Sequence, residues 1–361
     1  MKMKNVTRVM LFVVICLVIF GALLILSSTG SMPFFKAHIA KVLIAFAGFF
    51  TFMLIPYEYY KKYSKYALLF SIVLLLLTPI LGTEKNGARR WIELWFFSFQ
   101  PSEMAKIVLI MHIAVMIEKK GELIADFKKG FRYALFWIGL VCLLVMIQPN
   151  VSNATIIMLI SFTVLYVGGA RLKHIAVTLG SLAVTGVIAI FTFYPHAVSR
   201  IMAFLTDEHM QVKQAKIALG SGGLLGLGLG NSRASDRFVP EPYGDFIFSI
   251  LGEETGFIGA FMVLMAYLVI FIAGIIISKR AKDSFGQLFA FGVSFTIILS
   301  AFINVAVVTG MAPTTGITLP FISFGGTSLL VFAISIGILM NIAMQNKAMP
   351  KLKIEAQTVG S

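Results

Sequence analysis

Cysteine and charge are both scarce in this chain. Its 361 residues include only two cysteines, Cys16 and Cys142, and both lie inside apolar runs without metal-ligand spacing. This excludes a framework of disulfides. Charged residues make up 13% of the sequence and hydrophobic residues 58%, with a mean hydropathy of +0.92. Such a composition excludes an ordinary soluble protein.

Several familiar catalytic motifs are missing as well. There is no G-x-S-x-G, no H-E-x-x-H and no paired D-x-D, and His112, His174 and His196 are scattered. The glycine-rich stretch SGGLLGLGLGNS lacks the G-K-[ST] of a phosphate-binding loop and follows no strand, so it does not indicate a nucleotide site.

What the chain has instead is a series of long apolar runs, each able to cross a bilayer. We predict an all-α polytopic membrane protein with about ten transmembrane helices, folded as a single integral-membrane domain over residues 1–361. The first run is not closed by an A-x-A site, so we interpret it as a retained span. The predicted spans are 9–27, 37–56, 65–81, 101–117, 131–148, 153–170, 174–193, 246–278, 284–309 and 320–345.

The placement of charge predicts the orientation. With the N-terminus in the cytoplasm, the cytoplasmic segments hold 19 of the 30 basic residues but only 6 of the 16 acidic ones. This positive-inside pattern favours a cytoplasmic location for both termini. It also accounts for the net charge of +14 without a nucleic-acid partner.

One connection is much longer than the others. Residues 195–244, between the seventh and eighth spans, fall on the outer side of the membrane. Ser199–Leu205 and Gln211–Leu219 have helical apolar spacing, and Gly220 is a natural helix stop. We therefore predict a large, structured extracytoplasmic loop.

The eighth span begins close to an acid, Asp245, where polar loop becomes apolar helix. A carboxylate at the boundary between water and lipid is partly desolvated, which suits a general base. Acids within membrane segments are functional candidates by default. Asp is also a favoured helix N-cap, and the two roles are compatible.

Two further groups of residues, predicted on the same side of the membrane as Asp245, are functional candidates. Arg89, Arg90 and Trp91 would either anchor the chain at the membrane interface or bind an anionic headgroup. Glu103 and Lys106 lie three residues apart, hence on one helix face, and we expect them to form an intramembrane ion pair that holds helices in register.

Small residues mark two more stretches near the membrane. Asp245, Ser249, Gly252 and Gly256 fall on one helical stripe, continued by Ala260, which either packs closely against a neighbour or floors a groove for a lipid tail. The segment MAPTTGITLPFISFGGTS, between the last two spans, has a Pro and Gly content that indicates backbone lining a cavity.

The stretches NGARRWI, FQPSEMAK, SGGLLGLGLGNS, FVPEPYGDFIFSILGEETG and TGITLPFISFGGTS resemble the SEDS family of bacterial cell-wall polymerases. They occur in the family's order across nearly the whole chain. The resemblance implies a peptidoglycan glycosyltransferase in the bacterial cytoplasmic (inner) membrane, with its active site on the extracytoplasmic side. The glycine-rich stretch is more similar to the division-type members than to the elongation-type ones.

The resemblance also implies a substrate, partners and site residues. The substrate would be lipid II, an undecaprenyl-diphosphate-linked disaccharide pentapeptide, and the partners a class B penicillin-binding protein and other divisome membrane proteins. Asp245 matches the family's essential aspartate, while Glu103 and Lys106 match its P-S-E-x-x-K pair. The chain departs from the family at Tyr243-Gly244, where many members have His-Thr, and at Asn150, where many have Asp. The candidate substrate-binding residues are Arg89, Arg90, Trp91, Arg233, Arg237, Glu241 and Ser249, with Mg²⁺ or Mn²⁺ as an alternative source of positive charge.

Two other functions remain open from the residues. One is a flippase for the lipid-linked precursor, which needs polar groups along the full crossing path; the span interiors have few. The other is a scaffold that only recruits a partner and needs no buried acid.

Overall fold

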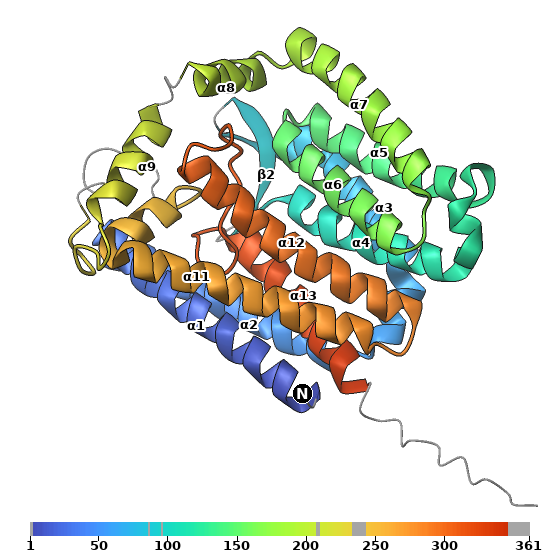
Figure 1. Ribbon diagram of the computed structural model, residues 1–361, viewed down its shortest axis with the longest axis horizontal. Coiled ribbons are helices and arrows are strands. Elements are labelled where there is room, and N and C mark those ends of the chain that lie inside the picture. Colours follow the sequence, from blue (N-terminus) through green and yellow to red (C-terminus); the bar gives the residue numbers. More distant parts are fainter. Residues whose placement is uncertain (1–2, 86, 95–96, 207–209, 233–242, 346–361) are drawn as a thin grey trace, which may run out of the picture.

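A computed structural model of the chain describes residues 3–85, 87–94, 97–206, 210–232 and 243–345. Its body is a bundle of long helices, and each corresponds to one of the ten predicted spans (Figure 1). The helices are α1 (Met3–Thr29), α2 (Met32–Leu54), α3 (Tyr57–Leu81), α4 (Pro101–Lys120), α5 (Arg132–Ile147), α6 (Val151–Val167), α7 (Leu172–Phe193), α11 (Ile247–Lys279), α12 (Ser284–Val308) and α13 (Gly326–Gln345).

Within the described residues, eight helical segments are long and apolar enough to cross a membrane. The segment over Phe127–Ile147 includes the one-turn helix η2 (Phe127–Phe131) ahead of α5, and a short 3-10 helix, η1 (Gly121–Ala125), precedes it. α6 is apolar but has only 17 residues. α4 is not among the eight because Glu103, Lys106 and Glu118 lie within it. The prediction of an all-α polytopic protein is confirmed.

The core is closed by pairs of helices far apart in sequence. α13 packs along α2, and α11 packs along α1; α11 also packs against α12, its neighbour in sequence (Figure 1). At Gly337 the two backbones of the first pair come so close that a Cβ would lie 2.4 Å from the carbonyl oxygen of Phe49. The Asn341 side chain accepts from the backbone N–H of Tyr57 at 2.9 Å and donates to the carbonyl of Met53 at 2.7 Å. Small and polar residues of this kind hold helices together where lipid supplies no hydrophobic driving force.

The connection between α3 and α4 is a small sheet, which the sequence did not predict. Its antiparallel strands are β1 (Thr83–Lys85), β2 (Ala88–Leu94) and β3 (Phe97–Phe99), in that order. Gly87 permits the turn between the first two strands with φ of +71°. The Thr327 hydroxyl of α13 donates to the carbonyl of Ser98 at 2.8 Å and accepts from Gln100 N–H at 2.9 Å, which fixes the sheet to the bundle.

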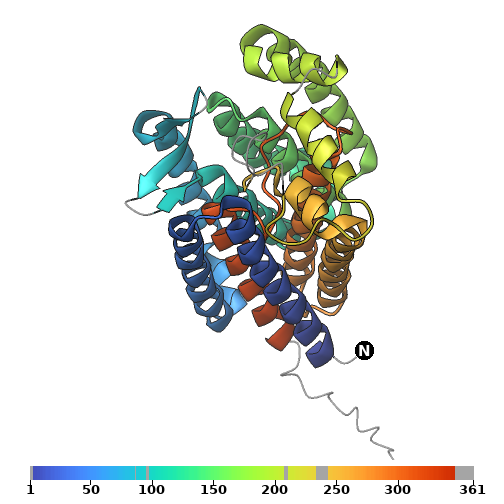
Figure 2. The same cartoon turned by 90° about the vertical axis from the view of Figure 1, so that its left-hand side faces the viewer.

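The long loop contains the two helices that the sequence predicts, α8 (Pro195–Leu205) and α9 (Met210–Ser221). α8 lies at the end of the molecule far from the N-terminus (Figures 1 and 2). It continues from α7, in which Ile175 is the one buried residue. α7 and α8 therefore form an arch beside the bundle and are not part of its core.

The glycine-rich stretch after α9 interrupts α11. Gly256 has φ of +67° and ψ of −171°, outside helical values, so α11 is kinked there and is not the continuous helix that the sequence predicts. The loop backbone replaces the lost helical bonds: Leu227 N–H donates to Glu253 at 3.0 Å, and Phe257 N–H donates to Gly223 at 2.9 Å. A Cβ on Gly256 would meet Gly226 N at 2.4 Å. The small-residue stripe was predicted to pack against a helix or to floor a groove; at Gly256 the close contact is with the loop backbone at Gly226 and Leu224.

Candidate functional site

Asp245 lies in a turn, Tyr243–Phe246, immediately before α11. Phe246 is the N-cap residue of that helix, so the N-cap role predicted for Asp245 is wrong; the chain turns for one more residue before the helix begins. The Asn304 amide of α12 donates to the carbonyls of Asp245 and Ile317, each at 2.7 Å. The turn is thus tied to α12 and to the loop that follows it, and the Asp245 side chain is half-buried.

An aromatic cluster holds the start of this turn. The Tyr243 ring lies 5.4 Å from Phe34 of α2 and 5.5 Å from Phe324 of the α12–α13 loop, measured between centroids. Phe324 N–H donates to the Tyr243 carbonyl at 2.9 Å, and the Lys41 ammonium lies 3.4 Å from the centre of the Phe324 ring. Tyr243, one of the departures from the family pattern, therefore has a packing role that fixes the backbone two residues before the acid.

A cavity of about 550 Å³ opens beside this region, between β2, α6, the α7–α8 arch and the α12–α13 loop. Ile303, the neighbour of Asn304, is in its wall; Asp245 is not among the described residues that line it. The segment Pro313–Thr315 also forms part of the wall, which confirms the predicted cavity-lining backbone. The polar residues that line the cavity are Arg90, Asn150, Ser152, Thr155, Tyr194, His196, Ser199, Arg200, Thr314 and Thr315.

Two guanidinium groups share this cavity. Arg90 donates through Nε to the carbonyl of Gln148 at 3.3 Å and through Nη2 to that of Pro149, in the tight turn between α5 and α6. Burial lowers the pKa of Arg90, and the positive charge of Arg200 lowers it further. Arginine still remains charged at neutral pH. No carboxylate is among the described residues that line this cavity, and two half-buried cations there favour an anionic ligand.

The sequence did not predict Arg200. It lies one helical turn after His196 in α8, and residues four apart share one face of a helix. That face reaches the cavity only because α8 folds back over β2, and the local sequence does not indicate this fold. A Cβ on Gly87 would lie 3.6 Å from His196 Nε2, so the strand turn and the helix meet at this edge.

The predicted cluster of Arg89, Arg90 and Trp91 is divided by the strand that contains it. Consecutive side chains of a strand point to opposite faces. Arg90 lines the cavity, whereas Arg89 and Trp91 are not among the described residues of its wall. The Arg89 side chain is 51% exposed and lies 3.9 Å from Glu84. Only the middle residue of the three is placed to contact a ligand in this cavity.

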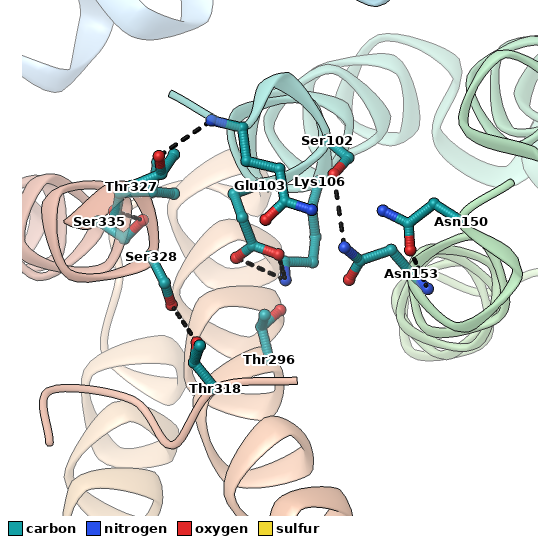
Figure 3. Close-up of polar contacts among 12 residues, drawn as sticks. Ser102, Glu103, Lys106, Asn150, Asn153, Thr296, Thr318, Thr327, Ser328 and Ser335 are labelled. Carbon is teal, nitrogen blue, oxygen red and sulfur yellow. Dashed lines mark hydrogen bonds and ion pairs between the residues drawn. The ribbon is translucent and has the colours of Figure 1, made fainter. Parts of the chain in front are cut away.

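The predicted ion pair is present. Lys106 Nζ lies 3.1 Å from both carboxylate oxygens of Glu103, and both side chains are buried. Figure 3 shows the pair among hydroxyl groups of α12, α13 and the preceding loop, including Thr318, whose hydroxyl donates to Ser328 at 3.0 Å. The pair lies within α4, and its Lys106 Nζ is 5.8 Å from the centre of the Phe332 ring of α13.

Hydrogen bonds connect the residue next to this pair with the cavity wall. Asn153 Nδ2 donates to the hydroxyl of Ser102, the neighbour of Glu103, at 3.4 Å. Asn150 caps α6 by accepting from Asn153 N–H, also at 3.4 Å (Figure 3). Its own Nδ2 is buried without a hydrogen-bond partner among the described residues, and Asn150 is in the cavity wall. Where the family often has an acid, this chain presents an amide donor.

The remaining candidates are less informative. Ser249 is fully buried and its hydroxyl donates to the Phe246 carbonyl at 2.7 Å, so this side chain is used within the helix start. Arg233, Arg237 and Glu241 lie outside the described residues. In the described part of the chain, no group of three or more His, Cys, Asp and Glu residues is arranged to hold a metal ion.

Comparison with known proteins places this geometry in context. A family model described as "Cell cycle protein", for FtsW, RodA and SpoVE, matches residues 3–348. The probable peptidoglycan glycosyltransferase FtsW of Geobacter sp. (strain M18) is 34% identical over 359 residues, covering 95% of this chain and 98% of the relative. Stage V sporulation protein E of Bacillus subtilis is 34% identical over 366 residues, covering 96% and 100%.

Solved structures agree in fold. Thermus thermophilus rod shape determining protein RodA has a TM-score of 0.72 at 24% identity, covering 93% of this chain and 96% of that one. A chain from "Structural coordination of polymerization and crosslinking by a peptidoglycan synthase complex" has a TM-score of 0.81 at 23% identity, covering 94% and 98%. At these identities the likeness establishes the architecture alone.

Proposed function

Because this chain belongs to the cell cycle protein family of FtsW, RodA and SpoVE, the SEDS family, we propose that it is a division-type peptidoglycan glycosyltransferase that polymerises lipid II into glycan strands. One structural observation supports this proposal. Asn304 holds the Asp245 turn, and its neighbour Ile303 lines the cavity that contains Arg90 and Arg200. The Asp245 backbone and the cavity with the two guanidinium groups therefore adjoin consecutive residues of α12.

In the proposed reaction, Asp245 takes the proton from the 4-hydroxyl of the acceptor sugar. The freed oxygen attacks the anomeric carbon of the donor, and the bond from that carbon to the diphosphate oxygen breaks. The leaving group is an activated lipid diphosphate, so one carboxylate suffices, unlike the pair used in most glycoside hydrolysis.

The negative charge that develops on the diphosphate needs positive partners. Arg90 and Arg200 supply two, and the planar guanidinium fork suits phosphate oxygens. Asn150 Nδ2, which has no partner among the described residues, supplies a neutral donor on the same wall. A divalent cation held by the substrate itself is an alternative source of charge.

The location and partners follow from the proposed substrate. The chain is a multi-pass membrane protein. We assign it to the bacterial inner membrane with Asp245 and the cavity on the extracytoplasmic side, where lipid II is consumed. A class B penicillin-binding protein would crosslink the strands, as a related complex couples polymerisation and crosslinking.

The test is polymerisation of lipid II by purified protein. We expect Asp245→Asn to lower the rate by about 10²–10⁴-fold, the usual loss on removal of a general base. Glu122→Gln, at an exposed acid beyond α4, is the matched control and should keep the wild-type rate. Thermal unfolding of both variants separates misfolding from lost chemistry. An Asp245→Asn protein that polymerises at the wild-type rate would refute the base assignment.

A further inference from the structure

Basic residues gather at one end of the bundle, where α4 ends and α5 and α7 begin. Residues 119–132 and 171–173 contain seven lysines and arginines but only two acids, Glu122 and Asp126. We call the surface formed by these two segments the basic platform. Six of its seven cations are exposed: Lys119, Lys128, Lys129, Arg132, Arg171 and Lys173. This excess of positive charge beside membrane spans favours an anionic ligand.

Contacts between the two segments make the platform one connected surface. Lys120 Nζ donates to the carbonyl of Lys129 at 2.7 Å, which joins the end of α4 to η2. The His174 ring of α7 lies 5.6 Å from the rings of both Phe127 and Phe131 in η2, measured between centroids. Cations that belong to three helices are therefore held at one end of the molecule.

The Asp126 carboxylate caps the backbone of η2. Its Oδ1 accepts from the N–H groups of Lys128 and Lys129, each at 2.8 Å. The hydrogen bond from Lys129 N–H lowers the pKa of Asp126, and the positive charges of Lys129 and Arg171 lower it further. Arg171 at the start of α7 is thus within electrostatic range of η2. The cap fixes the backbone that carries Lys128 and Lys129, whose side chains are exposed to a ligand.

An exposed apolar stripe begins at the platform and runs along α5. Its members repeat at helical spacing and are between 43% and 61% exposed: Tyr133, Phe136, Leu143 and Ile147. On a membrane span, such a stripe is covered by lipid chains. At its first residue, Lys120 Nζ lies 4.1 Å from the centre of the Tyr133 ring, and Arg132 Nη2 donates to the Tyr133 hydroxyl at 3.0 Å. Tyrosine favours the level where headgroups meet acyl chains, so the cations lie at headgroup level.

The combination of charge and apolar stripe selects among anionic ligands. A phosphodiester accepts hydrogen bonds from several ammonium and guanidinium groups at once. An acidic peptide would meet the charges but leave the adjoining stripe on α5 uncovered, whereas the acyl chains of a lipid cover it. A zwitterionic headgroup brings an ammonium of its own, which the cations of the platform repel. An anionic phospholipid satisfies both parts of the surface.

We propose that the basic platform binds an anionic phospholipid, whose phosphate contacts Lys128, Lys129 and Arg132 while its acyl chains lie along the exposed face of α5. This helix has 16 residues and is about 24 Å long. The cavity with Arg90 includes Pro149, in the turn after the other end of α5. The two sites are therefore separate, and binding at the platform does not depend on the proposed polymerase reaction.

The test compares lipids that differ in headgroup charge. Full-length protein is placed in nanodiscs of phosphatidylcholine with increasing phosphatidylglycerol, and bound lipid is measured by native mass spectrometry. We expect phosphatidylglycerol to be retained over phosphatidylcholine. The triple variant Lys128→Gln, Lys129→Gln, Arg132→Gln keeps long polar side chains but removes three charges. It should lower the retention of phosphatidylglycerol by at least about tenfold, with an unchanged thermal unfolding temperature because all three side chains are exposed.

A matched variant separates a site from the general attraction between a basic protein and an anionic bilayer. The triple variant Lys62→Gln, Lys279→Gln, Lys282→Gln removes the same charge from exposed positions outside the platform, and should retain phosphatidylglycerol as the wild type does. Lys128→Arg with Lys129→Arg keeps the charge of the platform and should also retain it. Equal losses in the two triple variants, or equal retention of both lipids by the wild type, overturns the proposal. So does crosslinking in native membranes that finds a protein segment on the platform.

Discussion

At the scale of single residues, neighbours in sequence have very different surroundings. Arg90 clamps two carbonyls and lines the cavity, while Arg89 pairs with an exposed acid. Lysine cannot reproduce the guanidinium fork. We therefore expect Arg90→Lys to lower kcat/KM for lipid II about 10- to 100-fold, the value of a charge-assisted hydrogen bond. Arg89→Lys should stay within about twofold, because exposed ion pairs contribute little. Similar losses in both variants would mean that the cavity does not bind the diphosphate.

Asn304 holds the backbone of Asp245 through a hydrogen bond to its carbonyl. Asn304→Ala removes the donor from two carbonyls, those of Asp245 and Ile317. Each buried carbonyl left without a donor costs about 1–3 kcal/mol. We expect a lower unfolding temperature in detergent together with slower polymerisation.

A matched control lies one turn earlier on the same helix. The Ser300 hydroxyl is buried with no partner among the described residues, so Ser300→Ala should leave stability unchanged or slightly higher. Loss of stability in Ser300→Ala but not in Asn304→Ala would contradict this account of the turn.

The sequence predicted some of these residues and not others, for physical reasons. The Glu103–Lys106 pair follows from helical spacing, and the junction between loop and helix at Asp245 follows from hydropathy. Neither signal reports contacts between distant segments. Arg200 was missed because its only local feature is a position one turn after His196. Ser249 was predicted to bind substrate, yet its hydroxyl is used by the carbonyl three residues earlier.

At the scale of elements, the contribution of the α11 kink to stability can be tested by adding one methyl group at Gly256. Gly256 has a backbone conformation open essentially to glycine alone, and other residues there cost about 1–3 kcal/mol. The added Cβ would also meet the loop backbone at Gly226 and Leu224. We expect Gly256→Ala to lower the free energy of unfolding by more than 1 kcal/mol, measured by thermal or denaturant unfolding in detergent.

Gly186→Ala provides the comparison. It is a helical glycine in α7 with nothing within 4 Å of its Cβ position, and alanine there should stabilise by roughly 0.5–1 kcal/mol. If the two substitutions had the same effect, the kink and its packing would not matter for stability.

Hydropathy predicted every long helix, because each must bring about twenty apolar residues into lipid. Hydropathy placed the start of α13 six residues too early, because the segment Pro320–Gly325 is apolar but is not helical. The strands over residues 83–99 were missed because their ends are polar and short. The kink was missed because its cause, a loop that supplies replacement hydrogen bonds, lies thirty residues earlier in the chain.

At the scale of the whole molecule, the orientation in the membrane is a prediction of the charge pattern. We place Ser199 outside and Lys129 inside; both are exposed. In a background without Cys16 and Cys142, a cysteine at 199 should react with a membrane-impermeant maleimide on intact cells, and a cysteine at 129 only after permeabilisation. The reverse labelling would place Asp245 on the cytoplasmic side and exclude the proposed reaction.

The pairing of α2 with α13 has a consequence for how the protein is made. α2, the second helix of the chain, packs mainly against α13, the last helix among the described residues. Insertion of each span can proceed one by one, but this pair cannot dock until the residues of α13 have been synthesised. Until then Gly337 cannot pack against the Phe49 backbone, and the early spans lie in the bilayer without this partner helix. Chains stalled before residue 326 should therefore be inserted yet remain easy targets for membrane proteases.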